Sequence, residues 1–286
     1  MPSSFEEPQD TNNSRSFKVK KLNLDEPAIM GILNVTPDSF FDGGKYKDEQ
    51  SIINQVDKMI NGGADIIDIG AYSSRPNAEH ISEEEELNRI IPIIKLIRLQ
   101  YPDVIISADT FGSIVAKECV AAGADLINDI SGGTIDENIF ITIAKLQVPY
   151  VLMHIKGTPQ NMQSNPEYIN VVEEVKAYFT EKIAQLNALG VTDIILDPGF
   201  GFGKTVEHNY QLLNNLDTFS EFGLPVLAGV SRKSMINKVI GTTPEKALNG
   251  TTVLNTIALL KGAKILRVHD VKEAKEAITL VSKLKQ

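Results

Sequence analysis

Polar and charged side chains follow several short apolar runs, at the points where buried strands would leave the core. One run, 194–196, ends at Asp197 and breaks into the glycine-rich turn 198–204, and similar runs end at Asp109, Asn128 and Arg267. Carboxylates accept hydrogen bonds and amides both donate and accept them, so Asp109, Asn128 and Asp197 suit a flat heterocycle with an amino-pyrimidinone edge. Lys233 and Arg267 add positive charge for an anionic group.

The end of the glycine-rich turn, Gly203-Lys204-Thr205, has the letters that close a phosphate-binding loop. That motif requires a glycine five positions before Gly203, and Pro198 stands there instead. The spacing therefore excludes a phosphate loop. Lys204 is then the basic residue of this set least expected to touch phosphate.

The polar residues are distributed over a regular alternation of apolar runs and helical patterns. The predicted strands are 28–34, 65–70, 104–109, 125–130, 150–154, 193–197, 225–230 and 264–269. The predicted helices are 48–62, 82–100, 112–123, 136–146, 167–189, 205–217, 245–262 and 271–284. Eight strands, each followed by a helix, are typical of a TIM barrel. A doubly wound sheet usually has fewer strands and a phosphate loop after its first, which the long loop 34–44 lacks.

We therefore predict an α/β fold, a single (β/α)8 TIM barrel over 26–286, preceded by a polar tail at 1–25. Phe17, Val19, Leu22 and Leu24 suggest a short strand or hairpin in that tail, and 1–16 are expected to be disordered. In such a barrel the loops after the strands form one catalytic face. An isolated Asp or Asn at a strand end often caps the next helix. Three such residues converging from different strands favour a binding site instead.

Two loops on that face, 34–44 and 71–80, are long and rich in Gly, Ser and Pro, as active-site lids tend to be. Long surface loops also occur without any function. Their position on the face that carries the polar strand ends favours a lid.

Composition limits the function further. The chain has 286 residues, a net charge of −9 and 42% hydrophobic residues, enough for a large core. The acidic balance argues against a general affinity for nucleic acid. Cys119 is the sole cysteine and is expected to be buried. No apolar run reaches the length of a membrane span and 1–25 lack a signal peptide, so we expect a cytoplasmic protein with no membrane partner.

The histidines do not form a metal motif. His80 and His208 are expected at the surface, while His154 ends a strand and could either face the site or make a structural hydrogen bond. No His-x-x-x-His pair or carboxylate set supports a tightly bound transition metal. The acidic run 83–86 opens a helix, where negative charge complements the helix dipole.

Taken together, these segments resemble dihydropteroate synthase of folate biosynthesis, from about residue 28 to the C-terminus. The matching segments are Asn34-Val-Thr-Pro-Asp-Ser-Phe-Phe-Asp-Gly-Gly44, Ser73-Ser-Arg-Pro76, Ser107-Ala-Asp-Thr110, Asn128-Asp-Ile-Ser-Gly132, Leu196-Asp-Pro-Gly-Phe-Gly-Phe-Gly-Lys204, Ser231-Arg-Lys-Ser234 and Arg267-Val-His269. The resemblance implies a transferase that joins (7,8-dihydropterin-6-yl)methyl diphosphate to 4-aminobenzoate, with Mg²⁺ as cofactor. It also implies a homodimer and a target of sulfonamides.

The resemblance assigns residues to four roles. The pterin would be held by Asp109, Asn128, Met153, Asp197 and Lys233. The diphosphate would be held by Asn34, Arg267 and His269, with the metal at or near Asn34. The 4-aminobenzoate would be framed by Phe40, Ser74, Arg75, Pro76, Phe202, Lys233 and Ser234. The catalytic residues would be Lys233, Asp109, Asp197, Arg267 and Asp42.

One position departs from the family pattern. The second loop usually has Arg-Pro-Gly, and here it is Arg75-Pro76-Asn77. Asn tolerates positive φ better than most residues, so the turn can be kept. The difference bears on loop geometry and on sulfonamide response, and it leaves the pterin site untouched.

Two other functions share parts of the pattern. A corrinoid methyltransferase has the same pterin grip but needs no 4-aminobenzoate pocket, and a catalytically silent pterin-binding protein would be expected to lack Lys233, Arg267 or Asn34. All three residues are present. For the dimer, helix 245–262 spreads the apolar residues Val253, Ile257, Leu259 and Leu260 widely, which fits either an interface or burial on the barrel.

Overall fold

The structure is a computed structural model of the chain. It describes residues 22, 24–35, 45–72, 81–158, 162 and 166–284, with the backbone alone for 45–48. Most of the predicted tail 1–25 lies outside these residues, so its disorder and its hairpin stay predictions. Leu22 lies within the described part and packs into the apolar cluster inside the barrel.

Eight parallel strands lie within the described residues and form one sheet, in the order β6-β5-β4-β3-β2-β1-β8-β7. The strands are β1 (Ala28–Asn34), β2 (Ile66–Gly70), β3 (Ile105–Asp109), β4 (Leu126–Asp129), β5 (Tyr150–Met153), β6 (Ile194–Asp197), β7 (Leu227–Ala228) and β8 (Ile265–Val268). A parallel bridge between Leu196 and Val226 joins the two ends of that order and closes the sheet. The predicted TIM barrel is confirmed, and every predicted strand is found within a few residues of its expected bounds.

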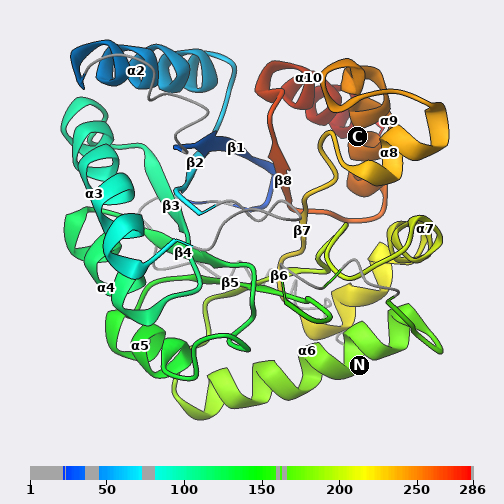
Figure 1. The fold of residues 1–286 in the computed structure, drawn as a ribbon. Helices are drawn as coiled ribbons and strands as arrows, with labels where there is room; N and C mark the ends of the chain where they lie inside the picture. Colours follow the sequence, from blue (N-terminus) through cyan, green and yellow to red (C-terminus); the bar gives the residue numbers. More distant parts are fainter. Residues whose placement is uncertain are drawn as a thin grey trace, which may run out of the picture.

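Helices surround the strands on the outside of the barrel (Figure 1). They are α2 (Lys45–Asn61), α3 (Glu83–Gln100), α4 (Ser113–Ala122), α5 (Ile139–Leu146), α6 (Val171–Ala188), α7 (Val206–Asn214), α8 (Ser234–Ile240), α9 (Leu248–Leu260) and α10 (Val271–Lys283), with the 3-10 helices η1 (Leu216–Phe222) and η2 (Pro244–Lys246). Helix α8 was not predicted. It has only 7 residues, too few to repeat a helical period.

The interior of the barrel has an apolar layer with a polar layer above it. Ile66, Ile105 and Leu126 belong to an apolar cluster enclosed by the strands. Side chains alternate along a strand, so the residues two positions further also face inward. These are Asp68, Ser107 and Asn128, all buried. On the outer face of the strands, a larger apolar cluster packs against the helices. The alternation thus places polar groups inside the barrel at the end where the strands finish.

No helix in the described part of the chain is long and apolar enough to cross a membrane.

Candidate active site

Arg267 is the centre of a polar network inside the barrel. Its Nε lies 2.7 Å from Asp68 Oδ2, and its Nη2 lies 2.6 Å from Asp109 Oδ2. Asp68 also accepts hydrogen bonds from Ser107 Oγ at 2.5 Å and from Asn128 Nδ2 at 3.1 Å. Strands β2, β3, β4 and β8 therefore contribute to one connected set. Of the residues predicted for the site, Arg267, Asp109 and Asn128 are brought together here.

The charges in this network stabilise one another. Burial alone would lower the pKa of Arg267, but the carboxylates of Asp68 and Asp109 outweigh it and raise that pKa. Burial raises the pKa of the Asp109 carboxyl, and the guanidinium of Arg267 opposes that rise. The guanidinium keeps its charge beside two carboxylates, so the network presents a fixed cation at the mouth of the barrel.

Asp197, at the end of β6, and Lys233, in the loop between β7 and α8, lie beside this network. Asp197 is buried and accepts a hydrogen bond from the Gly199 N–H at 2.7 Å. Lys233 Nζ donates to the carbonyl oxygen of Phe200 and lies 4.6 Å from the centroid of the Phe202 ring. The cation thus sits over an aromatic face, a favourable electrostatic contact.

The pKa values of this pair are shifted by burial and by each other. Burial lowers the pKa of Lys233 to about 8, although the charge of Asp197 opposes the shift. Burial raises the pKa of Asp197, while Lys233 acts in the opposite direction. Ionisable groups of opposite charge whose pKa values are shifted, at one mouth of the barrel, are typical of a functional site.

An apolar cluster borders the polar groups. It contains Ile130, Met153, Ile155 and Met162, with Phe111 and Phe202 packed against it. Met153 pairs with Asp197 in the register of β5 and β6. Met153 therefore lies next to Asp197 at the ends of neighbouring strands, and its contact with a bound pterin stays a prediction.

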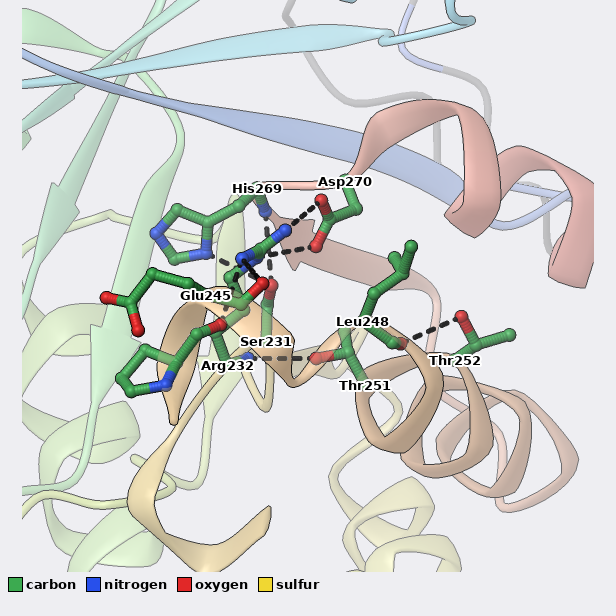
Figure 2. Close-up of polar contacts among 9 residues, drawn as sticks. Ser231, Arg232, Glu245, Leu248, Thr251, Thr252, His269 and Asp270 are labelled. Atoms are coloured by element: carbon green, nitrogen blue, oxygen red, sulfur yellow. Dashed lines mark hydrogen bonds and ion pairs between the residues drawn. The ribbon is translucent and has the colours of Figure 1, made fainter. Parts of the chain in front are cut away.

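His269 and Ser231 connect the loops after β7 and β8 (Figure 2). Ser231 Oγ lies 3.1 Å from His269 Nδ1 and accepts a hydrogen bond from the His269 N–H at 3.2 Å. Lys233 and Ser234 follow Ser231 closely in the chain, and Ser234 is exposed at the start of α8. The predicted residues His269, Lys233 and Ser234 thus lie on two loops that contact each other.

Asn34 ends β1 with an exposed side chain and pairs with Gly70 of β2. Among the described residues, no group of three or more His, Cys, Asp or Glu side chains is placed to hold a metal ion. Mg²⁺ commonly keeps several waters and uses one or two protein oxygens plus substrate phosphates. A single amide oxygen at an open barrel mouth fits that kind of site. It does not fit a metal held by protein ligands alone.

Five predicted site residues lie outside the described part of the chain. They are Phe40, Asp42, Ser74, Arg75 and Pro76. Asn77, the departure from the family pattern, also lies there. Their assignments stay predictions.

Asp68 is the residue of the network that sequence reasoning missed. It stands in the middle of an apolar strand and has no turn after it, so it does not look like a strand-end group. The sequence feature that could have revealed it is its spacing of two residues from Ile66, because side chains two apart on a strand face the same side, here the inside of the barrel. A carboxylate at an inward, fully buried position requires a partner, and here the partner is Arg267.

Lys204 holds the glycine-rich turn after β6 together through hydrogen bonds from its ammonium group. Lys204 is buried, and its Nζ lies 2.9 Å from His154 Nδ1 and 2.9 Å from the Gly199 carbonyl oxygen. His154 therefore makes the structural hydrogen bond, the second of its two predicted roles.

His208 was predicted to be solvated, and this is wrong. It is half-buried against Tyr168, and its Nδ1 caps α7 by accepting from the Thr205 N–H at 3.3 Å.

Comparison with known proteins assigns this site to a class. The chain matches the pterin binding enzymes over residues 30–269 and belongs to that family. It is 47% identical to dihydropteroate synthase of Haemophilus influenzae over 254 residues, which cover 88% of this chain and 92% of that protein. Within the pterin binding enzymes, the chain therefore belongs with the dihydropteroate synthases, which are transferases.

Solved structures agree with this assignment. Dihydropteroate synthase of Yersinia pestis in complex with a sulfonamide drug superposes with a TM-score of 0.88 at 40% identity, covering 94% of this chain and 98% of that one. The Xanthomonas albilineans enzyme in complex with 7,8-dihydropteroate gives a TM-score of 0.82 at 38% identity, covering 92% of this chain and 95% of that one.

Proposed function

We propose that the barrel joins (7,8-dihydropterin-6-yl)methyl diphosphate to 4-aminobenzoate, giving 7,8-dihydropteroate and diphosphate. The observation that carries the proposal is the network of Arg267 with Asp68 and Asp109, set beside Asp197 and Lys233 at one barrel mouth. The relatives support it, because one of their structures holds 7,8-dihydropteroate and another holds a sulfonamide drug.

In this proposal the pterin binds across the inner faces of β3, β4 and β6. Asp109 and Asp197 accept hydrogen bonds from the ring and amino N–H groups of the pterin, since an ionised carboxylate has only acceptors. The hydrogen bond from Asn128 Nδ2 to Asp68 fixes the amide, so its carbonyl oxygen is the acceptor for a further pterin N–H. Lys233 Nζ donates to a pterin acceptor, and Met153 packs on the ring.

The diphosphate binds above the pterin, between Arg267, His269 and Asn34. Arg267 uses Nε and Nη2 for its two carboxylates, which leaves Nη1 for a phosphate oxygen. Bound Mg²⁺, with Asn34 as a protein ligand, would neutralise charge on the diphosphate oxygens. Removing the metal with a chelator should abolish turnover, and restored turnover on adding Mg²⁺ would support this part of the proposal.

The 4-aminobenzoate binds at the outer rim. Phe202 gives an aromatic wall, while Lys233 and Ser234 give donors near its carboxylate. Phe40 and the segment 74–76, which are not among the described residues, would complete the pocket. Phe202→Leu should then raise KM for 4-aminobenzoate more than KM for the pterin diphosphate.

Catalysis in this site depends on separated charge and not on a strong base. The pterin ring stabilises a developing cation at its methylene group, so the diphosphate leaves early in an SN1-like step and the weak aniline nucleophile attacks afterwards. Asp109 and Asp197 stabilise the cationic pterin, whereas Arg267 and His269 hold the departing diphosphate. The catalytic role of Asp42 stays a prediction. The lid role of the loops 34–44 and 71–80 also stays a prediction.

One assay separates this proposal from its rivals. The protein is incubated with the pterin diphosphate, Mg²⁺ and 4-aminobenzoate, and both dihydropteroate and released diphosphate are measured. A corrinoid methyltransferase or a silent pterin-binding protein would give neither product. Absence of product with verified substrates would overturn the proposed reaction.

We also propose a homodimer through the face formed by α8, α9 and α10, which lie together in Figure 1. Large apolar side chains are exposed there: Val239, Ile240, Val253, Leu260, Leu280 and Leu284. Helix α9 is partly buried on the barrel and partly free for an interface. Leu259 is buried, while Val253 is 50% and Leu260 54% exposed. Sedimentation velocity of the wild type and of Val253→Glu tests the dimer. A wild-type monomer at micromolar concentration would contradict it.

The cytoplasmic location also stays a proposal, which cell fractionation tests.

A further inference from the structure

Arg232 connects the loop after β7 to the loop after β8. Its Nε lies 2.8 Å from Asp270 Oδ2 and its Nη2 lies 2.6 Å from Asp270 Oδ1, a two-pronged ion pair (Figure 2). Its Nη1 donates to the carbonyl oxygens of Pro244 at 2.9 Å and Glu245 at 3.1 Å. A planar guanidinium that uses three nitrogens in this way has little freedom to move.

The backbone of Arg232 is held as firmly as its side chain. Its φ is 57°, in the left-handed region that side chains other than glycine rarely adopt. Its N–H donates to Thr251 Oγ1 at 3.0 Å, and its carbonyl oxygen accepts from Asn237 Nδ2 at 3.1 Å. Such a conformation persists where the surroundings over-determine it, and it is common near functional sites.

The two loops joined in this way carry groups proposed to hold different parts of the substrates, the pterin and 4-aminobenzoate on one loop and the diphosphate on the other. Lys233 directly follows Arg232, and His269 directly precedes Asp270. The Ser231–His269 contact adds a second link between the same loops. A change in the Arg232–Asp270 pair would therefore alter the distance between Lys233 and His269 without touching either side chain.

We propose that Arg232 is a positioning residue for catalysis, which acts through Asp270 to hold the Lys233 loop in register with the His269 loop. This inference rests on the roles proposed above for Lys233 and His269. Neither Arg232 nor Asp270 needs to contact a substrate. The pair sets the geometry between the 4-aminobenzoate side of the site and the diphosphate side.

A purely stabilising ion pair is the alternative, and the chain offers a matched control for it. Arg98 Nη2 lies 2.5 Å from Asp125 Oδ2, and Arg98 Nη1 donates to the carbonyl oxygens of Pro102 and Val104 at 2.8 Å each. The two pairs are similarly exposed, with 24% and 25% for Arg98 and Asp125 against 25% and 16% for Arg232 and Asp270. Arg98–Asp125 lies at the opposite end of the barrel, before β3 and β4, which is the end away from the catalytic face and serves stability.

The test compares Arg232→Gly, Asp270→Asn and their double variant with Arg98→Lys and Asp125→Asn. Glycine adopts the backbone conformation of residue 232 without strain, so Arg232→Gly removes the side chain and its ion pair while the backbone can keep its conformation. We expect Arg232→Gly and Asp270→Asn each to lower kcat on the order of 10²-fold, the effect of displacing a catalytic group by about 1 Å. KM for each substrate should change less, because each loop keeps its own contacts.

Three further results are expected. The double variant should be no worse than the single ones, since both remove the same interaction. Guanidinium ion at low concentration should restore part of the activity of Arg232→Gly. Arg98→Lys and Asp125→Asn should lower Tm and leave kcat unchanged.

Two results would overturn the inference. One is wild-type kcat in Arg232→Gly or Asp270→Asn despite a lower Tm. The other is a double variant in which the two losses multiply, which would indicate independent roles. An inactive wild type is a different outcome, because it overturns the proposed reaction itself and the positioning role with it.

Discussion

Lys204 Nζ lies 2.9 Å from His154 Nδ1, and both side chains are buried under the glycine-rich turn after β6. The same Nζ donates to the carbonyl oxygens of Gly199 at 2.9 Å and Phe202 at 3.0 Å. Burial lowers the pKa of Lys204, and burial followed by the charge of Lys204 lowers the pKa of His154. The lysine that suggested a phosphate loop therefore shapes the turn that carries Phe202.

Lys204→Met should lower the free energy of unfolding by at least about 2 kcal/mol, because it leaves the buried His154 imidazole and the Phe202 carbonyl oxygen without the hydrogen bonds they receive from Lys204 Nζ. Urea denaturation measures this. Lys264→Met is the matched control, since Lys264 Nζ donates to the carbonyl oxygens of Leu24 at 3.0 Å and Asp25 at 3.2 Å near the surface. Equal losses in the two variants would contradict the structural role of Lys204.

Activity should fall as pH rises through the pKa of Lys233, which burial lowers to about 8. Below this pKa the ammonium is charged and can bind pterin and carboxylate acceptors. Above it the amine is neutral and the site loses a cation. The pH profile of kcat/KM reports this group in the free enzyme. In Lys233→Arg the guanidinium stays charged, so the alkaline fall should disappear while overall activity drops. An unchanged profile in Lys233→Arg would assign the fall to another group.

Asp68→Asn should weaken turnover although Asp68 need not touch a substrate. The change removes the charge that pairs with Arg267 and weakens the orientation of Asn128, so kcat/KM for the pterin diphosphate should fall at least tenfold, roughly the value of one charge-assisted hydrogen bond. Asp65→Asn is the control in the same segment, because Asp65 lies before β2 begins and accepts from the Ile29 N–H at 2.8 Å. If both variants kept wild-type kinetics, the network would be structural.

Arg267→Ala and Asp197→Asn should each lower turnover by roughly two orders of magnitude or more, the scale of losing one preorganised electrostatic partner. Arg267→Ala should also destabilise the fold, because it leaves Asp68 and Asp109 side by side without a cation. Arg267→Lys keeps the charge and separates the two effects. Steady-state kinetics and Tm, measured on the same preparations, decide the matter; near-wild-type turnover in both main variants would refute these assignments.

The fold was predictable because its signals are local. Each strand is a run of apolar residues that ends in a polar group or a turn, and each run is buried on both faces of the sheet. The start of α3 was equally clear, since the acidic run 83–86 opens it, and the structure adds Ser82 Oγ as a cap that accepts from the Glu85 N–H at 3.2 Å. The strand-end groups Asp109, Asn128 and Asp197 were found for the same reason.

The contacts that organise the site were not predictable from one sequence. Lys204 and His154 are 50 residues apart, and Arg232 and Asp270 are 38 apart. Nothing in the spacing of either pair indicates that the two side chains meet, because the meeting depends on how the barrel closes. Asp68 was missed for a different reason, since its neighbours in the chain are apolar and its partner comes from β8.

The barrel is closed between β6 and β7 by one backbone bridge, Leu196 with Val226, and β7 itself is only 2 residues long. Lys233 Nζ spans this junction when it donates to the Phe200 carbonyl oxygen. The side chain proposed to bind both substrates thus also contributes a hydrogen bond across the junction where the barrel closes. A substitution that removes the ammonium of Lys233 would therefore change how the barrel closes as well as the proposed substrate contacts.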